Sequence, residues 1–253
     1  MIEFFNEIFK VPENSIINRK IPKKLFYENA ELNKNEQKVI QEKIDFTYSL
    51  YKINQTKTKI LKYENREYKY IEILIIYSKL KTDEKCDKII NILHKSFKNP
   101  VFLIIEYNEK FIFSLGHKRI NQVDITKRVT EKIINTEWIQ LNSKSDFKHV
   151  KLIKNLAFEK QNQKNLYELY SDYYNLMVNF NALNLKPDLN ITDKQSAYKN
   201  EGILLEVKEK ENEIEYLKKA IKRNKGLNFN EKFEINVKIK ELEKSINNLK
   251  EKL

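Results

Sequence analysis

The segment Tyr68-Lys-Tyr-Ile-Glu-Ile-Leu-Ile-Ile-Tyr-Ser-Lys-Leu80 is the most strand-like stretch of the chain. It is rich in β-branched and aromatic residues, which favour a pleated and largely buried strand. Upstream, Phe46, Tyr48 and Leu50 alternate in the same way, and we extend this strand pattern through Lys57–Tyr63. The centre of the protein is therefore predicted to be a β-sheet.

A helix and a hairpin are expected to follow this strand. Thr82 or Asp83 is a suitable cap for a helix that runs to Ser96, and Val101–Glu106 with Phe111–Leu115 then predict two strands joined by a tight turn. The order strand, helix, hairpin is typical of an α+β fold. We expect a small, mostly antiparallel sheet covered by helices.

Five further segments carry helix or strand signals outside this core. Asn33 with Glu36 three residues later has the form of a capping box, which begins a helix. The remaining expected elements are helices over Ile2–Phe9, Asp124–Ile134 and Phe147–Asn181, and a short edge strand over Thr136–Leu141.

The C-terminal segment has the repeat of a coiled coil. Apolar residues recur at alternating spacings of four and three, at Ile235, Ile239, Leu242, Ile246, Leu249 and Leu253. A similar apolar stripe precedes them, at Ile203, Val207, Ile214, Leu217 and Ile221. The short polar connection Asn224–Asn230 contains a glycine, and a short connection makes neighbouring helices antiparallel. We predict an antiparallel coiled-coil hairpin.

Charge and pattern together suggest three regions. We expect a basic α+β body over residues 1–145, a helical connector over 146–195 and the hairpin over 196–253. The net charge is +12, but residues 201–253 hold 13 basic and 11 acidic residues, so the preceding part carries +10. Basic excess of this kind attracts polyanions or keeps a protein soluble.

Composition excludes several classes of site. Cys86 is the one cysteine, and His94, His117 and His149 lack any metal-ligand spacing, so we expect neither a disulfide nor a metal site. With three glycines there is no glycine-rich phosphate loop, and we expect no cofactor. No apolar run reaches the length of about 20 residues that a membrane helix needs, so we expect a cytoplasmic protein without a membrane contact.

The sharpest local feature is a cluster of cations around Pro22. Arg19, Lys20, Lys23 and Lys24 lie within six residues and suit a phosphate backbone or an acidic partner protein, although a solvated loop explains them equally well. Lys118 and Arg119 follow a predicted strand and either extend the same candidate surface or are ordinary solvated residues, and the second interpretation is favoured.

Two other chemical interpretations remain open. A restriction-like nuclease needs clustered carboxylates that hold a metal, with a lysine nearby, and Glu72, Glu106 and Lys118 are the candidates. The expected acid-x-Lys triplet is missing at Glu72, so no catalytic residue is assigned. Tyrosines 167, 170, 173 and 174 serve either as helix packing or as a platform for stacking bases, and packing is favoured.

The chain resembles a prokaryotic family known as domain of unknown function 4391. The resemblance rests on Asn18-Arg-Lys-Ile-Pro-Lys-Lys-Leu-Phe-Tyr27, with further matches at Tyr48-Ser-Leu-Tyr-Lys52, Pro100-Val-Phe-Leu-Ile and Thr136-Glu-Trp138. Members of this family often lie beside helicases and methyltransferases of restriction or anti-phage islands. The resemblance therefore implies a role as a partner of such proteins and carries over no catalytic residue.

These observations favour a non-catalytic accessory subunit of a helicase-containing defence or restriction-like complex. The hairpin would dock a helicase or methyltransferase subunit, and the basic body would contact nucleic acid. The residues expected to dock the partner are Ile214, Leu217, Ile221, Ile239, Leu242, Ile246 and Leu249. A metal-dependent nuclease and a homodimeric nucleic-acid-binding protein are the alternatives.

Overall fold

A six-stranded sheet lies at the centre of the first of two units, Met1–Met177 and Val178–Leu253. The computed structural model describes residues 2–140, 147–224 and 228–253. In spatial order the strands are β1 (Ile16–Lys20), β2 (Ile44–Asn54), β5 (Glu72–Leu80), β6 (Val101–Tyr107), β7 (Lys110–Ile120) and β8 (Arg128–Asn135). A separate two-stranded sheet consists of β3 (Tyr63–Glu64) and β4 (Lys69–Tyr70).

The α+β class is confirmed, but the expectation of a small sheet is wrong. Four of the neighbouring pairs are antiparallel, whereas β5 and β6 run parallel, with Leu74 opposite Val101 and Lys79 opposite Glu106. Parallel neighbours need a crossover connection. Here the crossover is α5 (Cys86–Ser96). After it, β6, β7 and β8 extend the sheet beyond β5.

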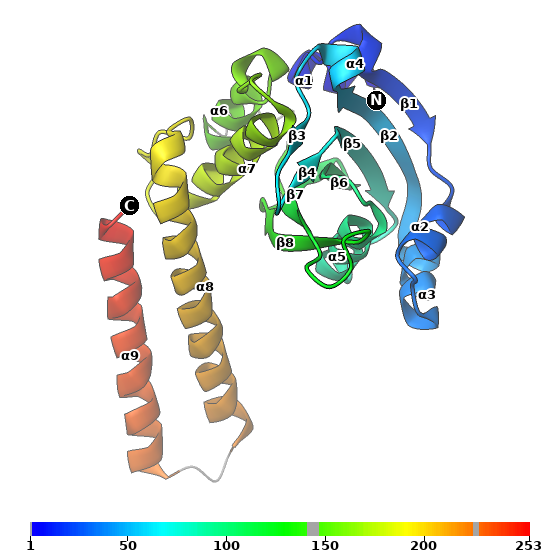
Figure 1. Ribbon diagram of the computed structural model, residues 1–253. Helices are drawn as coiled ribbons and strands as arrows, with labels where there is room; N and C mark the ends of the chain where they lie inside the picture. The colour runs from blue at the N-terminus through cyan, green and yellow to red at the C-terminus, as the bar shows by residue number, and fades with distance from the viewer. Residues whose placement is uncertain (1, 141–146, 225–227) are drawn as a thin grey trace. The chain divides into compact units, whose positions relative to one another are not determined.

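Helices cover both faces of this sheet (Figure 1). On one face, α2 (Lys23–Asn29), α3 (Lys34–Lys43) and α5 pack into an apolar core that includes Ile40, Leu93 and Leu103. On the other face, α1 (Ile2–Phe9) inserts Phe9, and α7 (Leu166–Ala182) contributes Tyr173. Because both faces are covered, the central strands β5 and β6 are almost continuously apolar.

Two of the predicted helices are confirmed, one of them with its cap. The helix α1 occupies Ile2–Phe9, and α3 begins at a capping box in which Asn33 and Glu36 bond to one another's backbone amides, each at 3.0 Å. Val101–Glu106 and Phe111–Leu115 are likewise strands, as β6 and β7.

The helix predicted over Asp124–Ile134 is wrong. The chain forms a turn and then the edge strand β8, in which Val129 lies opposite Arg119 and Ile133 opposite Gly116. Pairing with β7 satisfies the backbone of these β-branched residues and outweighs their helical spacing. The strand expected over Thr136–Leu141 is reduced to a single bridge between Ile139 and Phe111, and residue 141 lies outside the described residues.

The long helix predicted over Phe147–Asn181 is interrupted. It consists of α6 (Phe147–Asn155), the 3₁₀ turn η2 (Phe158–Lys160) and α7. Asparagine side chains cause the break, since Asn162 Oδ1 accepts from the amide of Lys164 at 3.0 Å and Asn165 Oδ1 from that of Glu168 at 2.9 Å. Such local bonds offer the backbone an alternative to the helix.

Two smaller boundaries also differ from the prediction. The strand pattern proposed for Lys57–Tyr63 is confirmed only at its end, where Tyr63 begins β3. Its first residues belong to the one-turn helix α4 (Gln55–Thr58), because Asn54 Oδ1 accepts from the amide of Lys57 at 3.0 Å. Neither Thr82 nor Asp83 caps α5, which begins at Cys86 after Lys85, a residue with a left-handed backbone (φ 61°). A second 3₁₀ turn, η1, covers Glu13–Ser15.

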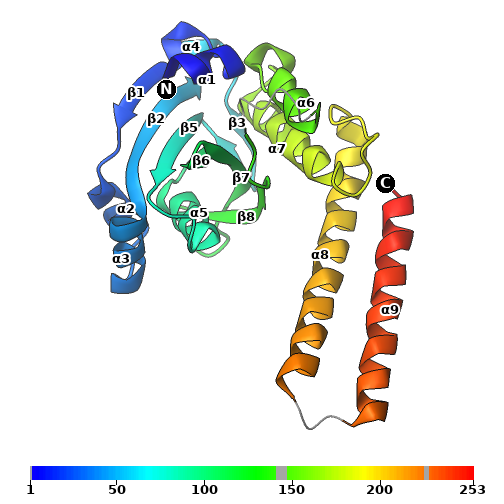
Figure 2. The same ribbon diagram turned by 180° about the vertical axis from the view of Figure 1, so that it is seen from behind.

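The second unit contains α8 (Lys194–Arg223) and α9 (Phe229–Glu251), which lie side by side in both views (Figures 1 and 2). Apolar residues of the two helices form one cluster around Val207, Ile214, Ile239 and Ile246. Lys218 pairs with Glu243 at 3.6 Å and Lys238 with Glu213 at 2.6 Å. The expected connection Asn224–Asn230 includes residues 225–227, which lie outside the described residues.

At the start of α8 a buried pair of asparagines joins the helix to the preceding segment. Asn179 Nδ2 donates to the carbonyls of Ile191 at 3.2 Å and Asp193 at 2.7 Å, and Asn200 Nδ2 donates to Asn179 Oδ1 at 2.9 Å.

Within the described part of the chain, no helix combines the length and the apolar character that crossing a membrane requires.

Phe9 tests the packing of α1 on the sheet. Its ring is fully buried and lies edge-on to Phe102 at 5.2 Å and to Phe113 at 6.3 Å. We expect Phe9→Ala to lower the free energy of unfolding by about 3–5 kcal/mol, because it leaves a cavity in the core. Urea unfolding, followed by the fluorescence of the single tryptophan, Trp138, measures this.

Phe4→Ala is the matched control, because Phe4 belongs to the same helix but is 37% exposed. We expect this variant to cost about 1 kcal/mol or less. Equal costs for the two variants would show that α1 is not seated on the sheet as described.

Candidate nucleic-acid interface

The cations around Pro22 lie on two elements instead of one loop. Arg19 and Lys20 are exposed residues of β1, which is an edge strand of the sheet, and Lys23 and Lys24 belong to the first turn of α2. The register with β2 shifts between Ile16 and Arg19, around Asn18 with its positive φ of 46°. Such an irregularity re-aims side chains on an edge strand.

A groove of about 510 Å³ lies beside these cations, and we call it the β1–α2 groove. Its lining residues come from β1, α2, β2 and β5: Ile17, Arg19, Lys20, Ile21, Pro22, Lys24, Leu25, Glu28, Ser49, Lys52, Glu72 and Leu74. Lys24 pairs with Glu28 at 3.4 Å, and Lys52 pairs with Glu72 at 2.5 Å. Arg19 and Lys20 therefore give the groove its excess positive charge.

Lys23 has a different role from its three neighbours. Its ammonium donates to the carbonyls of Gln41 at 3.1 Å and Ile44 at 2.5 Å, at the end of α3. Burial, followed by the charge of Lys81, lowers the pKa of Lys23. This side chain ties α2 to α3 and thereby positions the groove.

Lys118 is buried, with 2% of its surface exposed. Its ammonium donates to the carbonyls of His94, at 2.5 Å, and Phe97, at the end of α5. Desolvation lowers the pKa of Lys118 to about 7. Lys118 therefore does not extend the exposed surface of Arg19 and Lys20, but stabilises the carbonyl end of α5 from inside the protein.

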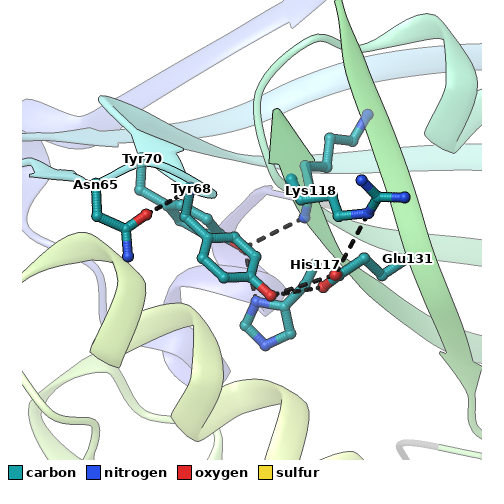
Figure 3. Close-up of polar contacts among 7 residues, drawn as sticks. Asn65, Tyr68, Tyr70, His117, Lys118 and Glu131 are labelled. Atoms are coloured by element: carbon teal, nitrogen blue, oxygen red, sulfur yellow. Dashed lines mark hydrogen bonds and ion pairs between the residues drawn. The ribbon is translucent and has the colours of Figure 1, made fainter. Parts of the chain in front are cut away.

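Arg119 belongs to a polar network on the other side of β7, which Figure 3 shows. Its Nε lies 3.9 Å from a carboxylate oxygen of Glu131, and the hydroxyl of Tyr68 donates to both oxygens of that carboxylate, at 3.2 and 3.1 Å. The hydroxyl of Tyr70 is 2.6 Å from His117 Nδ1. Three strands separate β7 from β1, so Arg119 and Arg19 belong to different surfaces.

The tyrosines of α7 take part in packing. Tyr170, Tyr173 and Tyr174 are buried, and the hydroxyl of Tyr170 accepts from the amide of Gly116 at 2.9 Å and donates to the carbonyl of Val101 at 2.8 Å. Tyr167 stacks on Tyr63 with ring centroids 4.9 Å apart. The packing interpretation thus describes these rings better than a stacking platform for bases.

The carboxylates considered for a nuclease do not lie together. Lys79 is opposite Glu106 in the parallel ladder, and Glu72 precedes Lys79 by seven residues on β5. At about 3.3 Å per residue, Glu72 and Glu106 are roughly 23 Å apart, so they do not share one metal ion. Glu106 instead pairs with Lys79 at 3.2 Å and accepts a hydrogen bond from Tyr77, while Glu72 accepts one from Asn99.

The seven residues expected to dock a partner face each other within the second unit. Ile214, Ile239, Ile246 and Leu249 are buried in the cluster between α8 and α9, and Leu217, Ile221 and Leu242 pack against it. The outward surface of these helices instead exposes Tyr216, Phe229, Phe233 and Val237, with exposed fractions between 40% and 81%.

Sequence reasoning missed Lys52 and a second cationic groove between α5 and β8. Lys52 lies in a strand pattern with no charged neighbour, so it was noted only as the end of the family match Tyr48–Lys52 and not as part of a charged site. The second groove combines Lys95 and Lys98 with Lys127 and Arg128. About thirty residues separate these two pairs, and only the position of α5 against β8 brings them together.

His94 gives a test of the buried polar layer beneath α5. Its ring is fully buried, with Nε2 2.9 Å from Ser114 Oγ. Desolvation, with a smaller contribution from the charge of Lys118, lowers the pKa of His94 to about 3. Because the unfolded chain binds this proton near pH 6.5, the stabilising effect of the neutral ring is present above pH 6.5 and is lost as the pH falls toward 3.

Between pH 6.5 and 4.5, we expect the free energy of unfolding of His94→Gln to change less with pH than that of the unaltered protein. The two slopes should differ by about 1.4 kcal/mol per pH unit. Urea unfolding at several pH values in that range measures the difference. Parallel pH profiles for the two proteins would contradict the neutral, buried state of His94.

Comparison with known proteins gives a family but no relative of known function. No curated protein matches the chain, and no solved structure does. The model of the family described as Domain of unknown function (DUF4391) matches residues 9–246. This range contains the motif around Pro22, both grooves, and nearly all of α8 and α9. The chain belongs to the DUF4391 family.

Proposed function

We propose that this protein is a non-catalytic accessory subunit of a helicase-containing anti-phage defence or restriction-like complex in the cytoplasm. Its first unit would contact nucleic acid, and its second unit would dock a helicase or methyltransferase subunit. The observation that carries this proposal is the exposed cationic pair Arg19 and Lys20 beside the β1–α2 groove. Residues 1–177 hold 32 basic and 23 acidic residues, a net charge of +9, and residues 178–253 hold 16 and 13, a net charge of +3.

The charge of the first unit supports the nucleic-acid contact. Lysine and arginine side chains release counterions from a phosphate backbone, and this is the main source of affinity for nucleic acid. Arg19 and Lys20 are exposed at the mouth of the β1–α2 groove, on an edge strand with no further neighbour in its sheet among the described residues. Lys24 and Lys52 also line the β1–α2 groove, where they pair with Glu28 and Glu72.

The second unit is proposed to be an antiparallel coiled-coil hairpin that docks the partner with its outer surface. The apolar cluster between α8 and α9 and the two ion pairs that cross it support the hairpin. The residues of that cluster are packed between α8 and α9. The docking surface is therefore assigned to the exposed residues Tyr216, Phe229, Phe233 and Val237. Phe229, Phe233 and Val237 follow each other at a spacing of four, which places them along one face of α9.

The family resemblance supplies the nature of the partner. The resemblance implies that genes of this family lie beside helicases and methyltransferases. A chain that exposes aromatic residues on a charge-balanced pair of helices suits a protein interface. A homodimer through the same surface is the competing arrangement.

Purification from the native host tests the docking surface. We expect a helicase or methyltransferase subunit to copurify with the full chain after nuclease treatment, and to be lost in the double variant Tyr216→Glu, Phe233→Glu. Both substitutions place a charge in the proposed interface, while the seam between α8 and α9 stays intact. Circular dichroism checks that the helices remain folded.

Phe147→Glu is the matched control, because Phe147 is equally exposed, at 77%, but belongs to the first unit. It should leave the partner bound. Retention of the partner by the double variant would refute the docking surface. A purified chain that light scattering shows to be dimeric, and that captures neither enzyme, would favour the homodimer.

A further inference from the structure

We propose that a second groove, between the end of α5 and the start of β8, binds the sugar-phosphate backbone of nucleic acid while the adjoining turn places two aliphatic side chains against the bases. This inference deepens the proposed function, on which it rests, by assigning a site to the nucleic-acid contact. We call this site the α5–β8 groove.

The α5–β8 groove consists of two adjoining hollows of about 430 and 540 Å³. Lys95 and Arg128 line both hollows, so the two hollows share these cations. Lys98 and Lys127 add two exposed cations, and Asn91, Thr126 and Thr130 add uncharged polar groups. Figure 2 shows α5 next to β8, the two elements from which most of these residues come.

The carboxylates that border the groove are engaged by other groups. Glu131 accepts from the hydroxyl of Tyr68 and lies near Arg119, and Glu31 lies 3.9 Å from Lys127. Asp124 accepts from Thr126, and hydrogen bonds to that residue lower the pKa of its carboxyl. Arg119 and Lys127 therefore offset part of the repulsion that Glu131 and Glu31 exert on a phosphate, whereas Asp124 keeps its negative charge.

A buried lysine side chain occupies the carbonyls at the helix end beneath the groove. Phe97 lines the groove, and its carbonyl accepts from the ammonium of Lys118. The carbonyl end of a helix carries a partial negative charge that repels anions. Because Lys118 occupies the carbonyls of His94 and Phe97, it offsets this repulsion at the place where a phosphate would pass.

The turn between β7 and β8 exposes two aliphatic side chains beside these cations. Val123 is 97% exposed and Ile125 is 74% exposed. The turn is held by its own side chains, since Asn121 Oδ1 accepts from the amide of Val123 at 2.8 Å and Asp124 Oδ1 from that of Thr126 at 3.0 Å. A ligand that covers these two side chains removes apolar surface from water, which is favourable.

Arg128 joins this turn to the groove. Its Nη1 donates to the carbonyls of Ile125 and Lys127, each at 2.9 Å. A phosphate bound at Arg128 would therefore lie close to the aliphatic pair. Proteins that distort a duplex insert aliphatic side chains between base steps in this way, next to cations on the backbone.

The α5–β8 groove also adjoins the β1–α2 groove. Lys24, Leu25 and Glu28 of α2 line the first groove, and Asn29 with the following Ala30 and Glu31 lines the second. The single short helix α2 therefore separates two cationic channels. One backbone strand that passes α2 would contact both, and this continuity favours a long polyanion over a small phosphate ligand.

A membrane surface is the other ligand that suits exposed aliphatic residues beside cations. Membrane-binding loops typically carry tryptophan or tyrosine at the level of the headgroups. The turn from Asn121 to Lys127 contains no aromatic residue, and its neighbouring cations line a concave channel. These features favour nucleic acid, and vesicles serve as the competing probe.

The first experiment measures binding of the full chain to a fluorescent 20-base-pair DNA duplex over a range of salt concentrations. In the triple variant Lys95→Gln, Lys98→Gln, Lys127→Gln we expect roughly tenfold weaker binding, and a slope of log K against log salt that is reduced by about two to three. The control triple variant Lys34→Gln, Lys110→Gln, Lys164→Gln changes the net charge equally at exposed sites elsewhere and should keep the slope.

Equal losses in the two triple variants, or no loss in the first, would overturn the assignment of the groove. In that case binding by the unaltered chain would still support the proposed function with its contact elsewhere. A chain that binds no duplex and no single strand, but still retains its enzyme partner, would refute the nucleic-acid half of the proposed function as well.

The second experiment examines the aliphatic pair with 2-aminopurine in the same duplex. Val123→Thr with Ile125→Thr keeps the shape and the backbone bonds of the turn. We expect the rise in 2-aminopurine fluorescence that marks unstacked bases to be lost, with the salt slope unchanged. An unchanged fluorescence signal, or binding to anionic phosphatidylserine vesicles that this double variant abolishes, would contradict the inference.

Discussion

The parallel pairing of β5 with β6 is the constraint on which the rest of the first unit depends. Two parallel strands cannot be joined by a turn, so the chain must leave the sheet at Leu80, cross one face as α5 and return at Val101. This crossover buries Ile89, Ile90 and Leu93 against the sheet and fixes where α5 ends. The end of α5 then faces β8, and this proximity creates the cationic groove.

The lysine residues of the first unit have two different roles: some bind carbonyls at helix ends, and others stay exposed. Lys118 is buried because the end of α5 presents unpaired carbonyls to the interior, and an ammonium satisfies them. Lys23 is held in a similar way at the end of α3. Two of the cations in the sequence clusters are thus needed to build the fold, and exposed residues such as Arg19, Lys20, Lys95 and Lys98 remain for a ligand.

The main elements could be predicted from the sequence wherever local pattern and tertiary structure agree. The strand Glu72–Leu80 and the capping box at Asn33 have signals that no long-range contact opposes. The segment Arg128–Asn135 could not be predicted, because its helical spacing is overruled by pairing with a strand that forms elsewhere in the chain. The sheet was expected to be small because short segments do not reveal how many of them will pair.

The candidate sites also differ in whether local sequence or long-range packing creates them. The cluster Arg19–Lys24 is contiguous, so the sequence marked it, although it could not show that Lys23 is used internally. The groove at Lys95, Lys98, Lys127 and Arg128 depends on a crossover and a strand pairing, which leave no trace in local spacing. Likewise, the heptad pattern located the apolar residues of α8 and α9 that pack against each other, but it did not mark the exposed residues Tyr216, Phe229 and Phe233.

Hydrogen–deuterium exchange of the full chain, with and without a DNA duplex, tests the division of roles between the two units most directly. The account predicts slower exchange on binding in Ile16–Asn29 and in the segment from Asn121 to Thr130, with no change in Phe229–Glu251. Protection confined to α8 and α9 would contradict it, because nucleic acid would then bind the unit to which we assign the protein partner.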